Sequence, residues 1–163
     1  MKSLFVGFLA MLAVLGPAAA EDFSDPKALV NGIYDDYHLG RTVADPSLYY
    51  STRLKGIFDQ AIENKVFASD AAMSGSEFTL NAVFNPFLPD LNALLFDVAI
   101  GEPAIAGDRA IVTVSYHNFD QPRLLTIAMI KEGDGWKVDD VSSMGNEDHW
   151  LLSWALTYDP LGF

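Results

Sequence analysis

The sequence predicts an α+β domain in which N-terminal helices pack on one face of an antiparallel sheet. Two observations lead to this fold class. Apolar residues recur at helical spacings of three and four in the first part of the chain, up to residue 62, and after residue 93 they alternate with the period of two that is typical of strands. The strands are joined by turn signals, which favours antiparallel pairing.

Two helices are predicted in the first half. Ser24 caps the first, Asp25-Pro26 opens it and Gly40 ends it. The second begins near Asp45-Pro46-Ser47. Each carries an apolar stripe that should face the core, formed by Leu29, Val30, Ile33, Tyr34 and Tyr37 in the first helix and by Leu54, Ile57, Phe58, Ala61 and Ile62 in the second.

The segment from Phe67 to Asn92 has no helical or strand period. Its most distinctive part is Asn85–Asp90, which holds two prolines and so forbids a regular helix or central strand. We predict an ordered loop, pinned by three apolar side chains, those of Phe84, Phe87 and Leu88.

Four strands are predicted after this loop. They are Leu94–Ile100, Ala110–Tyr116, Leu124–Lys131 and Trp136–Val141. Gly107-Asp108 forms the turn before the second strand, and Glu132–Gly135 forms a tight hairpin before the fourth. The apolar run Asp148–Leu156 predicts a last, short helix that docks at the edge or mouth of the sheet.

The first twenty residues predict export. Lys2 supplies a positive charge, Leu4–Leu15 an apolar stretch, and Ala18–Ala20 the small residues that a signal peptidase needs. The apolar stretch is shorter than the roughly 17–25 residues of a membrane span, and Gly16-Pro17 breaks a helix directly after it. We therefore predict a cleaved signal peptide over residues 1–20 and a soluble protein that is periplasmic or secreted.

Length, cysteine content and charge limit the domain number, the kinds of site and the classes of partner of the exported part. About 140 residues without linker, repeat or low-complexity tract predict a single domain over residues 21–163. The chain contains no cysteine, which excludes disulfides, thiolate metal sites and a lipoprotein anchor. Its formal net charge is −12. Such a surface repels phosphates and anionic lipids, so it argues against nucleic-acid or membrane partners and favours a cationic partner.

Several motifs carry a resemblance to a known family. They are Ile33-Tyr34-Asp35-Asp36-Tyr37, Ser51-Thr52-Arg53-Leu54, Asn85-Pro86-Phe87 and Gly135-Trp136-Lys137-Val138-Asp139-Asp140-Val141. With the element order, they resemble the nuclear-transport-factor-2-like superfamily (cystatin-like cone folds), and within it the exported bacterial proteins grouped as domain of unknown function 3828. The resemblance implies a curved sheet around a concave pocket, and pairing of two copies through the open sheet face, but no reaction. That family's loop usually reads Asp-Pro-Phe, and the change to Asn85 argues against a strict chemical role for this position.

Four residues are candidates for lining such a pocket. Asp97 interrupts an apolar strand, Tyr116 ends the next one, and Trp136 and Asp140 belong to the last. A buried carboxylate or a hydroxyl can act as acid or base, but strand alternation also allows Asp97 to face solvent and Tyr116 to be a core residue with a bonded hydroxyl. His117 falls on the face opposite to Tyr116, which weakens any catalytic pair between them.

Asp139 and Asp140 are neighbours on the last strand and are predicted to point to opposite faces, so at most one of them enters a pocket. An inward carboxylate needs a cationic partner, for which Arg53 and Lys55 are candidates. A structural salt bridge between helix and sheet is the simpler interpretation. Spacings typical of calcium, zinc, phosphate or dinucleotide sites are missing from the sequence, so no metal and no cofactor is predicted.

Trp150 and Trp154 lie four residues apart. Docking in the core is the favoured interpretation, and the alternative is that they form an exposed ridge or close the pocket mouth. The leading functional prediction is a non-catalytic binding module that takes a small apolar ligand or an envelope protein. One alternative is a cofactor-independent isomerase or lyase that uses Asp97, Tyr116 or Asp140. The other is an inhibitor or immunity protein that masks a basic enzyme with its acidic surface.

Overall fold

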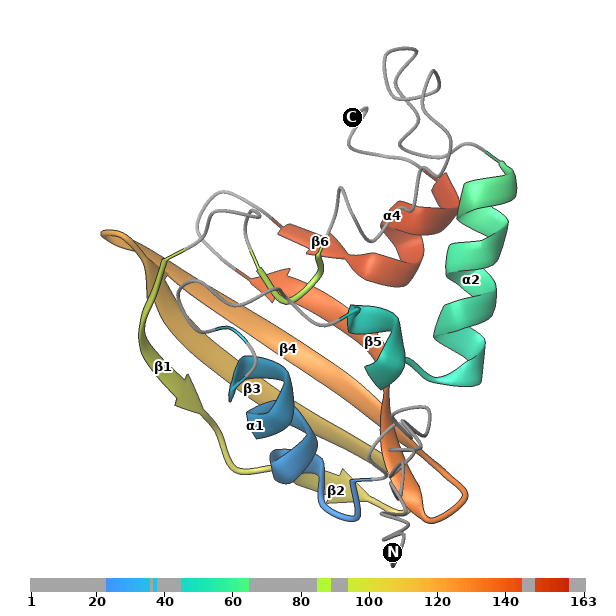
Figure 1. The fold of residues 1–163 in the computed structure, drawn as a ribbon, viewed down its shortest axis with the longest axis horizontal. Helices are drawn as coiled ribbons and strands as arrows, with labels where there is room; N and C mark the ends of the chain where they lie inside the picture. The colour runs from blue at the N-terminus through green and yellow to red at the C-terminus, as the bar shows by residue number, and fades with distance from the viewer. Residues whose placement is uncertain are drawn as a thin grey trace, which may run out of the picture.

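The computed structural model describes residues 23–35, 37, 45–64, 85–88, 94–144 and 149–158. In chain order the elements are α1 (Pro26–Asp35), the 3-10 helix η1 (Pro46–Tyr49), α2 (Thr52–Glu63), β1 (Leu95–Ile100), β2 (Ala104–Ala106), β3 (Arg109–Asn118), β4 (Gln121–Glu132), β5 (Gly135–Met144), β6 (His149–Leu151) and α4 (Leu152–Tyr158), as Figure 1 shows. The predicted α+β class is confirmed. The predicted signal peptide and most of the predicted loop, with Phe84 and Asp90, lie outside the described residues. The first helix was predicted to run to Gly40, but α1 ends at Asp35 and Tyr37 lies outside the helix.

The strands form one six-stranded antiparallel sheet. Its order is β1-β3-β4-β5-β6, with β2 also pairing with β3. The predicted turns are confirmed: Gly107 and Gly133 have φ angles of 65° and 61°, which glycine adopts without steric cost. Figure 1 shows β3, β4 and β5 as long, bent strands at the centre of the sheet. The short strand β2 was not predicted from the sequence, because three residues are too few to show a period.

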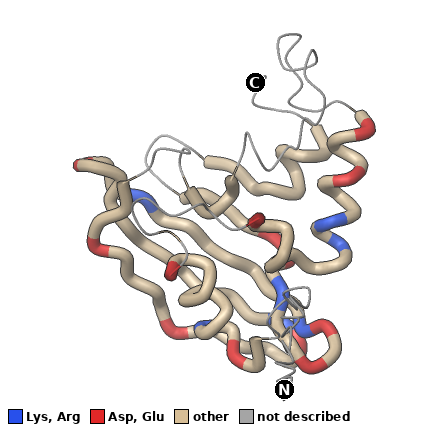
Figure 2. The backbone as a smooth tube through the Cα atoms, viewed as in Figure 1, with Lys and Arg blue, Asp and Glu red and all other residues tan. Residues whose placement is uncertain are grey.

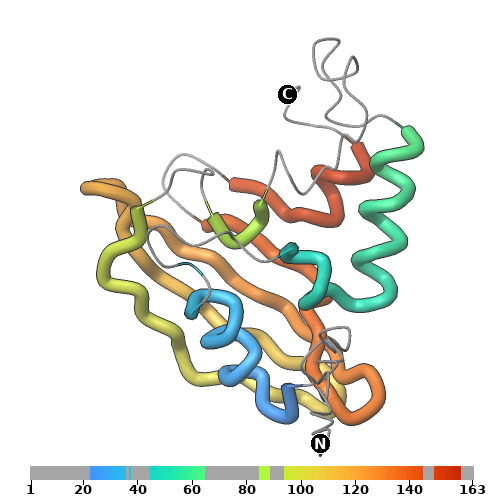
Figure 3. Tube along the Cα trace, in the orientation of Figure 1, coloured from blue at the N-terminus to red at the C-terminus, as the bar shows by residue number. Residues whose placement is uncertain are grey.

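One face of the sheet is buried under helices. Along β3 the buried residues alternate with exposed ones, and in β4 every second residue from Leu125 to Met129 is buried. Figures 1 and 3 show α1 lying across the β3 side of the sheet, and α2 and α4 side by side near β5. The core therefore lies between this face and the helices, where Leu29, Ile33, Leu54, Val112, Val114, Ile127 and Val138 have at most 1% of their surface exposed.

The N-terminal helices differ from the prediction in their caps. Asp25, not Ser24, caps α1, since its Oδ1 accepts from the Ala28 amide at 2.9 Å. The second predicted helix is two elements, because Tyr50 is extended (φ −76°, ψ 145°) and separates η1 from α2. This break places the Ser51 amide 2.7 Å from the Val138 carbonyl of β5.

Other sequence predictions fail at the ends of these elements. Ile62 was expected in the core and is 45% exposed near the end of α2. The predicted C-terminal helix over Asp148–Leu156 begins only at Leu152, and His149–Leu151 form β6 instead. His149–Leu151 form a strand because they pair with Ser142–Met144 at the edge of β5. A local apolar pattern does not reveal such long-range pairing.

Candidate binding groove

The outer edge of β5 is covered by several short segments. β6 pairs only with its last part, Ser142–Met144. Nearer its start, the Trp136 amide donates to the Phe23 carbonyl at 2.8 Å, and the Val138 carbonyl accepts from the amide of Ser51. Because an open strand edge tends to pair with other chains, these contacts protect β5. They also fix the start of α2 beside the sheet.

A β-bulge in β5 brings two carboxylates together at this edge. The pairing with β4 shifts between Ala128 and Met129, which leaves Asp139 as the extra residue beside Asp140. Arg53 of α2 contacts both: its Nη1 lies 3.5 Å from Asp139 Oδ1, and its Nη2 lies 3.9 Å from Asp140 Oδ2. The prediction that the two acids point to opposite faces is therefore wrong, because the bulge interrupts the alternation. The predicted salt bridge between helix and sheet through Arg53 is confirmed.

Asp139 links this bulge to the start of α2. It is 8% exposed, and its Oδ1 accepts from the Ser51 hydroxyl at 2.7 Å. The same hydroxyl oxygen accepts from the Leu54 amide at 3.0 Å and so caps α2. The Arg53 Nη1 also donates to the Asp139 carbonyl at 2.8 Å. The bulge thereby orients α2 through hydrogen bonds as well as through packing.

Asp140 has the matching role at the start of α4. Its Oδ1 accepts from the Ser153 amide at 3.0 Å, and its Oδ2 accepts from the Ser153 hydroxyl. Leu151 pairs with Ser142, so Ser153 is the residue that would next face Asp140 in an antiparallel ladder. The Asp140 carboxylate accepts from the Ser153 amide in place of a main-chain carbonyl of β5. The chain can therefore leave the ladder and turn into α4 without an unpaired amide.

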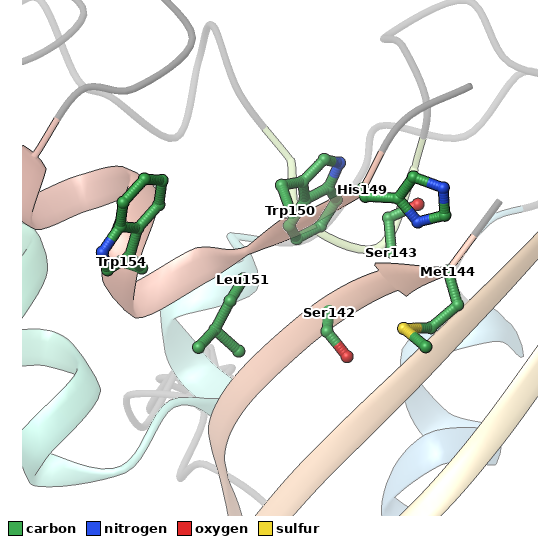
Figure 4. Close-up of a pocket in the computed structure, with 7 residues that line it drawn as sticks. All are labelled: Ser142, Ser143, Met144, His149, Trp150, Leu151 and Trp154. Atoms are coloured by element: carbon green, nitrogen blue, oxygen red, sulfur yellow. The ribbon is translucent and has the colours of Figure 1, made fainter. Parts of the chain in front are cut away.

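Beside this cluster, β5, β6 and α4 form a groove of about 270 Å³. Figure 4 shows the rings of Trp150 and Trp154 extending to one side of the chain, whereas Leu151 and Ser142 extend to the other. Among the described residues that line it, most are apolar, and the polar side chains are two serines and one histidine. The lining residues are Ser142, Ser143, Met144, His149, Trp150, Leu151 and Trp154.

The groove continues into an exposed aromatic face of α4. Trp154 is 51% exposed and Tyr158 is 67% exposed, and their ring centroids lie 5.7 Å apart. Met144 and Leu151 in the groove are also exposed. The opposite face of α4 is buried in the core through Leu152, Ala155 and Leu156. Large apolar side chains that gather on a surface in this way usually mark a place where a ligand or partner binds.

The structure brings only two of the six predicted site residues, Trp150 and Trp154, into this groove. Asp97 is in solvent: its side chain is 87% exposed, and its Oδ2 lies 3.8 Å from His117 Nδ1. It sits at a bulge in β1 with a φ of 54°. Trp136 belongs to the core and is 5% exposed. With Asp140 bound to Ser153, the four pocket candidates do not converge on one site.

Tyr116 belongs to a buried cluster of tyrosines around Phe87. It is 3% exposed, and its hydroxyl donates to the Phe87 carbonyl at 3.4 Å, as does the Tyr34 hydroxyl at 3.2 Å. Burial, together with Tyr116 and Tyr37 nearby, raises the pKa of Tyr34 well above 10.0. Both hydroxyls are thus structural donors, and the prediction of Tyr116 as a core residue with a bonded hydroxyl is confirmed.

Tyr50 lies in the same core but has a different environment. Its ring stacks on Phe58 with centroids 4.9 Å apart, and it is 1% exposed. Within the described part of the chain, its hydroxyl has no hydrogen-bond partner. Burial, and to a smaller degree Tyr37 and Asp45, raises the pKa of Tyr50.

The predicted loop is confirmed where the structure describes it. Phe87 is fully buried and Leu88 is 8% exposed. The Asn85 side chain accepts from the Phe87 amide at 2.9 Å and donates to the Tyr37 hydroxyl at 2.8 Å. Asn85 thus has a structural role, which agrees with the sequence argument against a chemical one.

Sequence reasoning missed most of the groove. Ser142, Ser143 and Met144 were not singled out, because they line it only through the pairing of β5 with β6. The signal that was available is the spacing of the two tryptophans. In the described part of the chain no three acidic, histidine or cysteine side chains gather into a metal site.

Charge is distributed unevenly around the groove. In Figure 2 the tubes of β6 and α4 are tan throughout, since neither element contains Lys, Arg, Asp or Glu.

Among the described helices, none is long and apolar enough to cross a membrane.

Comparison of the chain with family models, with curated proteins and with solved structures gives no match.

Proposed function

We propose that this chain is an exported, non-catalytic binding module that holds a small apolar ligand in the groove between β5, β6 and α4. The observation that carries the proposal is the pair Trp150 and Trp154 lining a groove of about 270 Å³. Small-molecule pockets usually have about 300–1,000 Å³ and mainly apolar walls with a few polar groups. The ligand should therefore be smaller than a drug-sized molecule.

The apolar walls also set the affinity. An apolar contact contributes roughly 25 cal/mol for each Å² removed from water, and small ligands gain at most about 0.3–1.5 kcal/mol per non-hydrogen atom. For a ligand of about ten such atoms we expect a dissociation constant on the order of 100 μM. The hydroxyl of Ser143, which pairs with Trp150 across β5 and β6, would orient a polar end of the ligand.

The proposal assigns binding and not catalysis, because the acid and base candidates lie apart. Asp97 faces solvent, the Tyr116 hydroxyl is bound in the core, and both carboxylate oxygens of Asp140 accept from Ser153. A general acid or base must lie within hydrogen-bond reach of the group it serves. None of these three lines the groove.

We also propose that the chain is a cone-type domain of the nuclear-transport-factor-2-like superfamily and that it works in the periplasm or outside the cell. The order of helices before strands, the bent central strands and the cover of one sheet face by helices support the first part (Figure 1). The signal-like segment with Lys2, Leu4–Leu15 and Ala18–Ala20 supports the second. N-terminal sequencing of the protein recovered from its source tests the export proposal: a start near Glu21 agrees with it, and a retained Met1 contradicts it.

Binding can be tested with the neutral dye N-phenyl-1-naphthylamine, whose fluorescence rises in apolar surroundings. We expect saturable binding by the purified protein, and a loss of about tenfold or more in affinity for Trp154→Ala. Phe119→Ala is the matched control, because Phe119 is 62% exposed in the β3–β4 turn and does not line the groove. Equal effects of the two substitutions, or no binding by the unmodified protein, would contradict the proposal.

A further inference from the structure

We infer that the groove selects an organic cation with an apolar body, such as a quaternary or aromatic amine. This inference rests on the proposed function and adds the chemical class of the ligand. It is carried by two features of the described residues: the aromatic faces at the groove and the distribution of charge around it.

The first feature is the aromatic surface. Trp150 and Trp154 line the groove, and Tyr158 extends it with its ring centroid 5.7 Å from that of Trp154 at an interplanar angle of 48°. The face of an aromatic ring is electron-rich and attracts a cation within about 6 Å of the centroid, and tryptophan does so most strongly. A ligand cation beside the Trp154 ring would therefore also lie near the ring of Tyr158, and aromatic faces grouped in this way recognise quaternary ammonium ions.

The second feature is charge. The described residues that line the groove include no Lys, Arg, Asp or Glu, so among them a ligand cation meets no fixed positive charge. On the described residues of β5, β6 and α4 the formal charges belong to Lys137, Asp139 and Asp140. Asp140 is two residues from Ser142, or about 7 Å along the strand, whereas Lys137 is five residues away, or about 17 Å. On the neighbouring strand β4, Arg123 is two residues from Leu125, which pairs with Ser143, so this cation offsets part of the negative charge at that end of the groove.

The carboxylates keep a net negative charge. Asp139 and Asp140 share one cation, Arg53, whose side chain is 52% exposed, so the cluster of three carries −1. The whole chain carries −12. Both charges attract cations and repel anions at the groove, and the attraction from groups at this distance is weakened by salt within a Debye length of about 8–10 Å. An anionic apolar ligand is therefore disfavoured.

The test compares two probes of nearly the same shape: phenyltrimethylammonium, which is cationic, and tert-butylbenzene, which is neutral. Their affinities are measured by displacement of the neutral dye from the purified protein. We expect the cation to bind about tenfold more tightly in low salt. Raising sodium chloride from about 20 mM to about 500 mM should reduce this preference several-fold, because the charge contribution is screened.

Two variants separate aromatic attraction from simple apolar contact. Trp154→Leu keeps an apolar side chain but removes an aromatic face, so it should weaken binding of the cation by more than it weakens binding of tert-butylbenzene. Phe119→Leu, away from the groove, should change neither.

The possible results distinguish this inference from the proposed function. If tert-butylbenzene binds at least as tightly as the cation while the dye binds in the groove, the inference is overturned and the proposed function stands. If neither the dye nor either probe binds, both are overturned.

Discussion

Two groups of aromatic side chains in this molecule have opposite surroundings. Around Phe87 the rings of Tyr34, Tyr50 and Tyr116 are buried, at most 6% exposed. At the groove, Trp154 and Tyr158 are more than half exposed. The buried group stabilises the fold, because its apolar area is already removed from water. The exposed group still has most of its apolar area in water, so a ligand that covers it would gain the free energy of that burial. For this reason we propose that the ligand binds there.

The two groups are joined by β5, and its bulge accounts for the difference. Trp136 and Val138, before the bulge, face the core. At the bulge, Asp139 and Asp140 hold the starts of α2 and α4. Asp140 binds both the amide and the hydroxyl of Ser153, so β6 ends at Leu151 and α4 begins there. One face of α4 then packs on the core, and the ring of Trp154 lies beside the groove. A polar cluster thus positions an apolar surface.

The largest effect on stability is expected when the buried group is broken at its centre. Phe87 is fully buried, and Phe87→Ala should lower the free energy of unfolding by about 3–5 kcal/mol, since a cavity remains. Phe119→Ala removes a ring that is 62% exposed and should change stability by less than about 0.5 kcal/mol. Urea denaturation followed by circular dichroism measures both, and similar losses would refute the assignment of Phe87 to the core.

The next largest effect concerns the link between the two groups. Asp140→Ala removes two acceptors from Ser153, and we expect a loss of about 1.5–3 kcal/mol in unfolding free energy. Dye binding in the groove should weaken as well, because α4 loses its anchor to β5. Asp97→Asn is the control, since the side chain of Asp97 is 87% exposed and asparagine tolerates the same positive φ. Intact dye binding by Asp140→Ala would show that this anchor does not shape the groove.

Much of this arrangement could be predicted from sequence, and the failures at the edge of β5 share one cause. The Glu132–Gly135 hairpin, the alternation along β3 and the tryptophan pair depend on neighbours in the chain, and each was visible as a local pattern. The bulge at Asp139, the strand β6 and the break at Tyr50 depend on which segment reaches the edge of β5. Such long-range pairing leaves no local period, so the serines and Met144 of the groove could not be identified.

A smaller effect distinguishes the hydroxyls within the buried group. Tyr34→Phe removes a hydrogen bond to the Phe87 carbonyl and should cost about 1 kcal/mol. Tyr50→Phe removes a buried hydroxyl for which the described residues provide no partner, so it should leave stability unchanged or raise it by about 1 kcal/mol. Thermal unfolding of the two variants provides the comparison. A reversed order would contradict the hydrogen-bond assignments.

The smallest expected effect is the pH dependence of stability that Tyr34 causes, and it is measurable only at alkaline pH. The pKa of Tyr34 is raised above 10.0 by burial, so the unfolded chain releases this proton before the folded protein does. Its contribution to stability is therefore complete below pH 10 and is lost as the pH rises above that value, by up to about 1.4 kcal/mol per pH unit. Tyr34→Phe should show a shallower decline than the unmodified protein in urea titrations above pH 10. Equal slopes would mean that Tyr34 is not protected from ionisation.

The central claim is that ligands bind at the exposed aromatic group, and the three tryptophans of the chain allow a direct test. Each gives one indole N–H signal in a nitrogen-15 correlation spectrum, assigned by single Trp→Phe variants. On titration with tert-butylbenzene, a neutral probe that does not depend on ligand charge, we predict shifts of the Trp150 and Trp154 signals and none of Trp136, which is 5% exposed. A shift of Trp136 alone would place the ligand in the interior, and unshifted signals for all three would remove the groove as a binding site.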